Sequence, residues 1–128
     1  MFKNLLNAAK QLANKIDRDE IQPTKIIGLS ENGKKIANYL KHLLNISGTS
    51  IINHQSSVIM ITDDGNLHLN KLIHAVNLYR QKKVKKIIVG IPVYKHEDVL
   101  NLEKHADAVY TIYEPETFIS AEEFYRDL

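Results

Sequence analysis

The sequence predicts an α/β fold in which a mostly parallel sheet of about five strands carries helices on both faces. Short β-branched runs alternate along the chain with longer segments whose apolar residues recur at helical spacing. One of these runs, Val58–Thr62, is apolar on both faces, which is typical of a central parallel strand. Because 128 residues with 44% hydrophobic content suit one core, residues 1–128 are expected to form a single Rossmann-like domain.

The first half of the chain is expected to contain two helices and three strands. Met1–Ile16 gathers its apolar residues on one helical face, and it carries three lysines and no acid. A packed first helix explains this segment better than a transit peptide, which is usually rich in Arg and Ser. The following elements are a strand over Lys25–Leu29, a turn over Ser30–Gly33, a helix over Lys34–Asn45 and strands over Ser50–Asn53 and Val58–Thr62.

The second half continues the same alternation of strands and helices. Asn66–Lys71 leads into a helix whose apolar face runs from Leu69 to Tyr79, and a basic turn follows. The remaining elements are a strand over Lys86–Ile91, a helix over His96–His105, a strand over Ala108–Ile112 and an aromatic tail from Glu114.

Composition excludes several classes of function. Without cysteine the chain can form no disulfide or thiolate metal site, and it has no cysteine nucleophile. No apolar run approaches the roughly 18 residues that span a bilayer, so no membrane association is expected and the cytoplasm is the expected location. The six histidines form no HxxxH or HxH pair, so no resident metal is expected.

The net charge of +2 hides an asymmetry along the chain. Residues 1–86 contain 14 Lys or Arg against 6 Asp or Glu, whereas residues 87–128 contain 3 against 9. Such a division could orient the protein toward a polyanion or toward a second copy of itself, giving a homodimer. The cations between Arg80 and Lys86 are explained best by a solvated turn at a helix C-terminus, so a nucleic-acid partner is not expected.

Two loops are candidate ligand sites, because ligands of such folds lie outside the carboxyl ends of the strands. These loops are Ser30–Gly33 and Asp63–Lys71. In the second loop, Asp63 and Asp64 could accept hydrogen bonds from a vicinal diol, hold a divalent cation or act as acid and base. The alternative is that Asp63–Gly65 simply makes a tight turn and caps the next helix.

The segment Val58-Ile-Met-Ile-Thr-Asp-Asp-Gly65 resembles the signature strand of type I phosphoribosyltransferases, and the resemblance covers nearly the whole chain. Phe2–Ala13 is similar to the leading helix of that family, and Ile26–Gly33 is similar to its first strand and pyrophosphate loop. Lys86–Val93 is similar to its next core strand, and the tail is most similar to one bacterial branch. The resemblance implies a phosphoribosyltransferase-like fold. It also implies transfer of ribose 5-phosphate from phosphoribosyl pyrophosphate to a nitrogen base, with Mg²⁺ bound only together with that substrate.

By this resemblance Asp63 and Asp64 hold the ribose hydroxyls, and the segment after them wraps the 5-phosphate. The usual Thr-Gly-x-Thr run of the family is replaced here by His68-Leu-Asn-Lys71, and a leucine stands where glycine lets the backbone approach phosphate. His68 and Lys71 could supply new phosphate contacts, or they could be solvated loop residues. The phosphate-loop candidates are Gly65, Asn66, Leu67, His68, Leu69, Asn70 and Lys71.

The pyrophosphate loop departs from the family as well. Where the bacterial branch usually has Pro-Arg-Gly-Gly, this chain has Ser30, Glu31, Asn32 and Gly33. The arginine of that branch would attract pyrophosphate by about 4 kcal/mol, for charges about 4 Å apart at an effective dielectric of about 20. Glu31 would instead repel pyrophosphate by a similar amount. A long charged helical segment of that branch is also missing, since only His54–Ser57 separates the second and third predicted strands.

Three functions stay open at this point. The first is a phosphoribosyltransferase-like protein with altered loops and weak or absent activity, which could retain a ribose-phosphate or nucleotide site. The second is an active phosphoribosyltransferase that uses His68 and Lys71 in altered roles. The third is a noncatalytic interaction module that uses only the fold. No catalytic residue is assigned.

Overall fold

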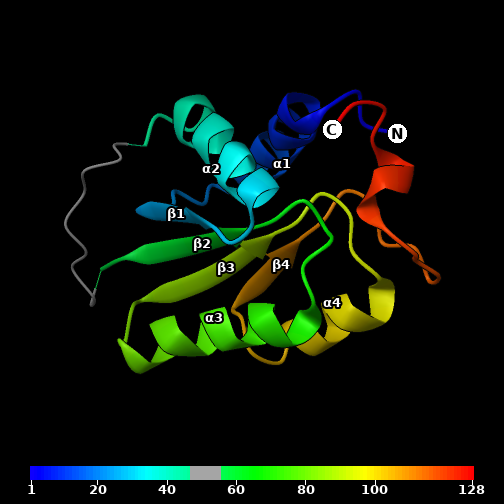
Figure 1. Ribbon diagram of the computed structural model, residues 1–128. Helices are drawn as coiled ribbons and strands as arrows, with labels where there is room; N and C mark the ends of the chain where they lie inside the picture. Colours follow the sequence, from blue (N-terminus) through cyan, green and yellow to red (C-terminus); the bar gives the residue numbers. More distant parts are fainter. Residues whose placement is uncertain (47–55) are drawn as a thin grey trace.

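A computed structural model describes residues 1–46 and 56–128 and confirms the predicted α/β class (Figure 1). The described residues form one parallel sheet in the order β1-β2-β3-β4. Its strands are β1 (Lys25–Gly28), β2 (Val58–Thr62), β3 (Lys86–Gly90) and β4 (Ala108–Tyr110). The second predicted strand in chain order, Ser50–Asn53, lies outside the described residues, as does part of the short connection before Val58.

Helices cover both faces of the sheet, as the sequence predicts. Figure 1 shows α1 (Leu5–Arg18) and α2 (Glu31–Leu43) on one face, and α3 (Leu69–Gln81) and α4 (His96–Leu102) on the other. A short 3-10 helix, η1 (Ala121–Phe124), follows in the C-terminal tail. Within the described part of the chain, no helix is long and apolar enough to cross a membrane.

The alternation of side chains along the strands creates two apolar cores. Met60 and Ile88 point to the face that α1 and α2 cover, and both belong to the same buried cluster as those helices. Ile59 and Ile87 precede them in the strands and belong to the cluster of α3 and α4 on the opposite face. Two covered faces explain why the β2 sequence is apolar at successive positions rather than at alternate ones.

The two ends of the chain meet beside α1. Phe2 and Tyr125 form a β-bridge, with the Phe2 N–H donating to the Phe124 carbonyl (2.8 Å) and the Arg126 N–H donating to the Phe2 carbonyl (2.9 Å). The rings of Phe2 and Tyr125 lie 5.1 Å apart. The first helix therefore begins at Leu5 rather than at Phe2, because Phe2 pairs with the tail.

Two cations of the basic run at the end of α3 contact other residues of the chain. The Arg80 guanidinium pairs with Asp107 at 3.2 Å and donates to the His105 carbonyl at 2.8 Å. The Lys82 ammonium lies 5.0 Å from the centre of the Tyr79 ring, within cation–π range. The two Arg80 contacts join α3 to the segment before β4.

Candidate functional site

The candidate site lies at the carboxyl ends of β1 and β2, where the chain leaves the sheet toward opposite faces (Figure 1). β1 continues into α2 on one face, and β2 continues into α3 on the other. Neighbouring strands whose connections diverge leave a crevice between their ends, which is where α/β proteins bind ligands. Residues from both loops that the sequence singled out line one cavity here, so the fold brings the two segments together.

Asp63 is completely buried and organises its own loop. Its Oδ2 accepts hydrogen bonds from the backbone N–H groups of Gly65 (3.2 Å) and Leu67 (3.0 Å), and its Oδ1 accepts one from the Ser30 hydroxyl. Burial raises the pKa of the Asp63 carboxyl, the Ser30 hydrogen bond opposes this rise and the charge of Asp64 adds to it. Asp63 therefore holds the loop after β2 and ties it to the start of α2.

Asp64 is 3% exposed and borders the crevice. Its Oδ1 accepts a hydrogen bond from the Asn66 N–H (2.9 Å), and its Oδ2 accepts one from the Asn32 amide (3.0 Å) and a longer one from the Asn66 amide (3.4 Å). Asn32 belongs to α2, so this bond spans the crevice from one strand end to the other. Two of the three donors are side-chain amides, which a ligand hydroxyl could replace.

The segment predicted as a turn, Ser30–Gly33, is in fact the start of α2. Ser30 is the N-cap and accepts a hydrogen bond from the Gly33 N–H at 2.9 Å, so α2 begins at Glu31 rather than at Lys34. The Asn-Gly pair favours a turn, but the cap stabilises the helix there instead. Gly33 allows close packing at this point, because a Cβ at this position would lie only 3.0 Å from the Asp63 Oδ1. The first turn of α2 thus packs directly on the loop after β2.

The predicted phosphate loop is only partly a loop. Leu69, Asn70 and Lys71 form the first turn of α3, and His68 is its N-cap. The His68 Nδ1 accepts a hydrogen bond from the Asn70 N–H at 3.2 Å, which requires the proton of the neutral ring to be on Nε2. Leu69–Lys71 therefore lie in the first turn of α3 rather than in the loop that precedes it.

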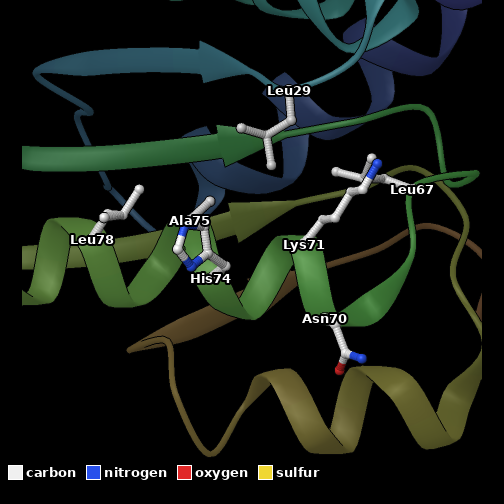
Figure 2. Close-up of a pocket in the computed structure, with 7 residues that line it drawn as sticks. All are labelled: Leu29, Leu67, Asn70, Lys71, His74, Ala75 and Leu78. Atoms are coloured by element: carbon white, nitrogen blue, oxygen red, sulfur yellow. The ribbon is translucent and has the colours of Figure 1, made fainter.

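Two cavities meet at Leu67. The smaller one, the crevice, has a volume of about 240 Å³ and contains two acids but no Lys or Arg among its lining residues. It is lined by Ser30, Glu31, Asn32, Asp64, Asn66 and Leu67. The larger one, the α3 groove, has a volume of about 470 Å³ and is mainly apolar. It is lined by Leu29, Leu67, Asn70, Lys71, His74, Ala75 and Leu78 (Figure 2).

The residues that hold the crevice loop from outside were not predicted from the sequence. The Tyr125 hydroxyl donates to the Asp64 carbonyl at 3.0 Å, and the Tyr94 hydroxyl donates to the Leu67 carbonyl at 2.8 Å. Asn66 accepts from the Ala121 N–H at 2.8 Å. Burial raises the pKa of both tyrosines, and nearby carboxylates add to the rise. Local spacing in the sequence holds no signal for these long-range bonds.

The crevice does not fit a cation held by the protein. Among residues 1–46 and 56–128, no group of three or more His, Asp or Glu side chains stands close enough together to bind a metal ion. Both oxygens of Asp64 already accept hydrogen bonds.

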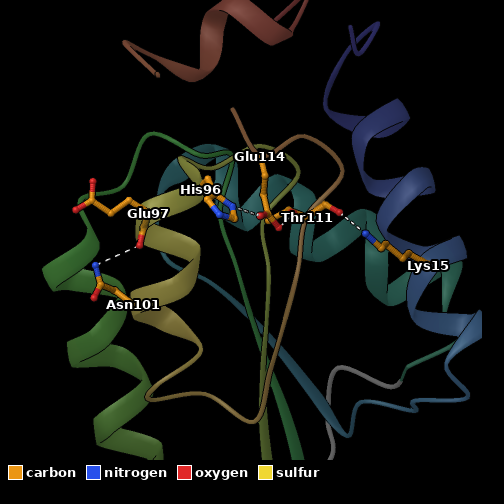
Figure 3. Close-up of polar contacts among 6 residues, drawn as sticks. All are labelled: Lys15, His96, Glu97, Asn101, Thr111 and Glu114. Atoms are coloured by element: carbon orange, nitrogen blue, oxygen red, sulfur yellow. Dashed lines mark hydrogen bonds and ion pairs between the residues drawn. The ribbon is translucent and has the colours of Figure 1, made fainter. Parts of the chain in front are cut away.

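A second polar cluster lies where α4 meets the segment after β4 (Figure 3). The Glu114 carboxylate accepts a hydrogen bond from the Thr111 hydroxyl (2.7 Å) and pairs with the His96 Nδ1 (2.9 Å). The Lys15 ammonium, from α1, donates to the Thr111 carbonyl at 2.7 Å. Burial acts to raise the pKa of Glu114, but the bonds from Thr111 and His96 outweigh it, so this pKa is lowered. The cluster links three elements and lies outside the crevice lining.

Comparison with known proteins identifies the fold. No protein-family profile matches the chain, and no curated protein matches it in sequence. Among solved structures, TT1426 from Thermus thermophilus has a TM-score of 0.85 at 13% identity, covering 98% of this chain and 90% of that one.

Two further similar structures belong to enzymes. The purine phosphoribosyltransferase from Pyrococcus horikoshii has a TM-score of 0.60 at 18% identity, and the match covers 88% of each chain. The UMP synthase of Leishmania donovani has a TM-score of 0.62 at 14% identity, and the match covers 86% of this chain and 27% of that one. This chain therefore has the phosphoribosyltransferase-like fold that its sequence resemblance implied.

Proposed function

We propose that the protein is a phosphoribosyltransferase-like domain that binds a ribose phosphate or nucleotide in the crevice and has weak or no transferase activity. The observation that carries this proposal is the chemistry of the crevice wall. Its described residues offer the carboxylates of Asp64 and Glu31 together with one hydroxyl and two amides, and no Lys or Arg is among them. Such a wall suits the hydroxyls of a sugar better than a chain of phosphates.

Only one member of the acid pair is placed to meet a sugar. Asp64 borders the crevice, and its amide partners Asn32 and Asn66 can turn toward ligand oxygens once a ribose diol donates to the carboxylate. Asp63 has no exposed surface, and its oxygens accept from two backbone N–H groups and from Ser30. We therefore assign ribose contact to Asp64 and positioning of the loop to Asp63.

The charge distribution disfavours pyrophosphate. Glu31 lies in the first turn of α2 and lines the crevice. Its negative charge therefore lies at the positive end of the helix dipole, which would otherwise attract an anion. Lys71 lines the neighbouring groove, and Figure 2 shows its side chain extending from α3 toward Leu67, which lines both cavities. One cation at that junction can offset part of the charge of a monophosphate, but it offsets a much smaller share of the several charges of phosphoribosyl pyrophosphate.

Isothermal titration calorimetry with ribose 5-phosphate, and separately with phosphoribosyl pyrophosphate and Mg²⁺, tests the proposal. We expect ribose 5-phosphate to bind at millimolar or lower concentration and the pyrophosphate compound to bind no more tightly. Asp64→Asn should weaken ribose 5-phosphate by about tenfold or more, since it removes a charged acceptor. The matched control Asp17→Asn changes an exposed acid of α1 and should leave binding unchanged.

Three results would contradict the proposal. Release of pyrophosphate from phosphoribosyl pyrophosphate in the presence of nitrogen bases would identify an active transferase. No heat with any of these ligands, from protein shown to be folded by circular dichroism, would favour the interaction module. An affinity for phosphoribosyl pyrophosphate that does not rise in Glu31→Arg would show that Glu31 does not set the preference against it.

A further inference from the structure

The α3 groove is an open apolar surface beside the crevice. In Figure 2 the side chains of Leu29 and Leu67 lie at the ends of the strand layer, and those of Ala75 and Leu78 lie on the side of α3 that faces them. Asn70 points the other way, toward α4. Leu78 is 45% exposed, so the groove leaves apolar area in contact with water.

The C-terminal tail presents one large apolar side chain that is almost fully exposed. Ile119 is 90% exposed, whereas its neighbour Phe118 stacks on Phe124 with ring centres 6.1 Å apart. The segment is held at both ends, by the His96 N–H bonded to the Pro115 carbonyl (2.9 Å) and by the bond from Ala121 to Asn66. Ile119 is therefore displayed from an anchored segment, and its exposure shows that it does not occupy the groove of its own chain.

The charges of the groove and the tail are complementary. From Lys71 to Lys86, α3 and the turn after it contain six Lys or Arg and no acid. From Glu114 to Glu123, the tail contains four Glu and no Lys or Arg. In both segments the apolar side chain lies between charged residues, since Leu78 lies between Lys71 and the basic turn and Ile119 lies between Glu116 and Glu122. Opposite charges around an apolar centre are the pattern expected of two surfaces that dock.

We propose that Ile119 of one copy of this chain docks in the α3 groove of a second copy, with the acidic tail against the basic α3 segment. When the second tail docks in the first groove in the same way, the two contacts are related by a twofold axis and the assembly closes as a homodimer. Because Leu67 lines both the α3 groove and the crevice, a tail docked in the groove lies next to the crevice of the partner. This inference does not depend on which ligand the crevice binds.

The test is sedimentation equilibrium of the full chain over a wide range of protein concentration. We expect a monomer–dimer equilibrium that weakens as salt concentration rises, because ion pairs at the rim are screened. Ile119→Asp and Leu78→Asp should each raise the dissociation constant by about tenfold or more, since each buries a charge in the apolar contact. The matched control is Leu100→Asp on α4, which changes a leucine of 50% exposure outside the groove and should leave the equilibrium unchanged.

Mixing the variants identifies the pairing. Ile119→Asp keeps an intact groove and Leu78→Asp keeps an intact tail, so an equimolar mixture can form one complete contact. It should associate more strongly than either variant alone. If Leu78→Asp proves unstable by circular dichroism, Leu78→Ser replaces it. A monomer at all concentrations, a dimer unaffected by either substitution, or a dimer sensitive to Ile119→Asp alone would each overturn the proposal.

Discussion

Replacing Ser30 by alanine removes two hydrogen bonds of its hydroxyl, and a matched control separates their contributions to stability. The Oγ accepts a hydrogen bond from the Gly33 N–H as the N-cap of α2, and it also donates to the buried carboxylate of Asp63. Ser30→Ala therefore removes a helix cap and leaves one oxygen of a buried acid without its donor. Asn4→Ala is the matched control, because Asn4 caps α1 with the same kind of bond to the Asn7 N–H (2.9 Å) and has no buried acid as a partner.

The two contributions can be estimated separately. Loss of an N-cap costs about 1 kcal/mol, which is the whole effect expected for Asn4→Ala. Loss of a hydrogen bond to a charged group costs about 1.5–3 kcal/mol more, so Ser30→Ala should lower the free energy of unfolding by about 3 kcal/mol. For a chain of this length such a loss lowers Tm by about 10 °C.

The assay is urea unfolding followed by circular dichroism at several pH values. The Ser30 bond lowers the pKa of Asp63, so it stabilises the ionised carboxylate. Its contribution is present above that pKa and is lost as the pH falls through it, whereas the cap contribution persists in acid. The cost of Ser30→Ala should therefore approach that of Asn4→Ala in acid. Equal costs of the two substitutions at neutral pH would refute the structural role assigned to Asp63.

Three further predictions concern the framework around the site. Gly28→Ala should destabilise the fold by about 3 kcal/mol in urea unfolding, because its Cβ would lie 2.2 Å from a backbone oxygen in the first turn of α2. Burial and then the Asp19 hydrogen bond raise the pKa of Tyr110 to about 12, so stability from its neutral phenol is lost as the pH rises through that value. In Asp19→Asn, ultraviolet titration should show this phenol ionising earlier. The lowered pKa of Glu114 gives stability that is present above its ordinary pKa and lost as the pH falls through the lowered one. His96→Ala should flatten this acid-side loss, and an unchanged pH profile would contradict the role of the His96 pair.

Apolar periodicity was sufficient to predict most of the fold. Successive apolar residues in Val58–Thr62 require a strand that is covered on both faces, and the sheet places helices on both. The start of α2 was placed too late because Asn32-Gly33 favours a turn by local conformation alone. Whether the helix begins earlier depends on the Ser30 cap and on the contact of Gly33 with Asp63, a residue of another loop. Such a contact leaves no mark in the spacing of nearby residues.

The candidate site could be located from the sequence but not resolved into roles. An acidic pair at the end of a buried strand predicts that a polar crevice lies there, and adjacent positions give both acids the same expected role. The roles are separated only by tertiary contacts, since Ser30 and two backbone N–H groups surround Asp63 while the amides of Asn32 and Asn66 meet Asp64. The bond from Tyr125 joins positions 61 residues apart, which no local pattern encodes.

The way the loop is held bears on how a ligand could bind there. Three other parts of the chain bond to the loop independently of the internal bonds of Asp63. They are α2 through Asn32, the tail through Tyr125 and Ala121, and the segment after β3 through Tyr94. A ligand that replaces the amide of Asn32 on Asp64 breaks one of these links and leaves the others in place. Binding would then require little ordering of the backbone, so most of the interaction energy would appear as affinity. It also follows that Asn32→Ala should weaken the loop only slightly in urea unfolding. Ribose 5-phosphate should lose no more than the roughly 1 kcal/mol of one neutral hydrogen bond on this variant, which is less than the loss expected for Asp64→Asn.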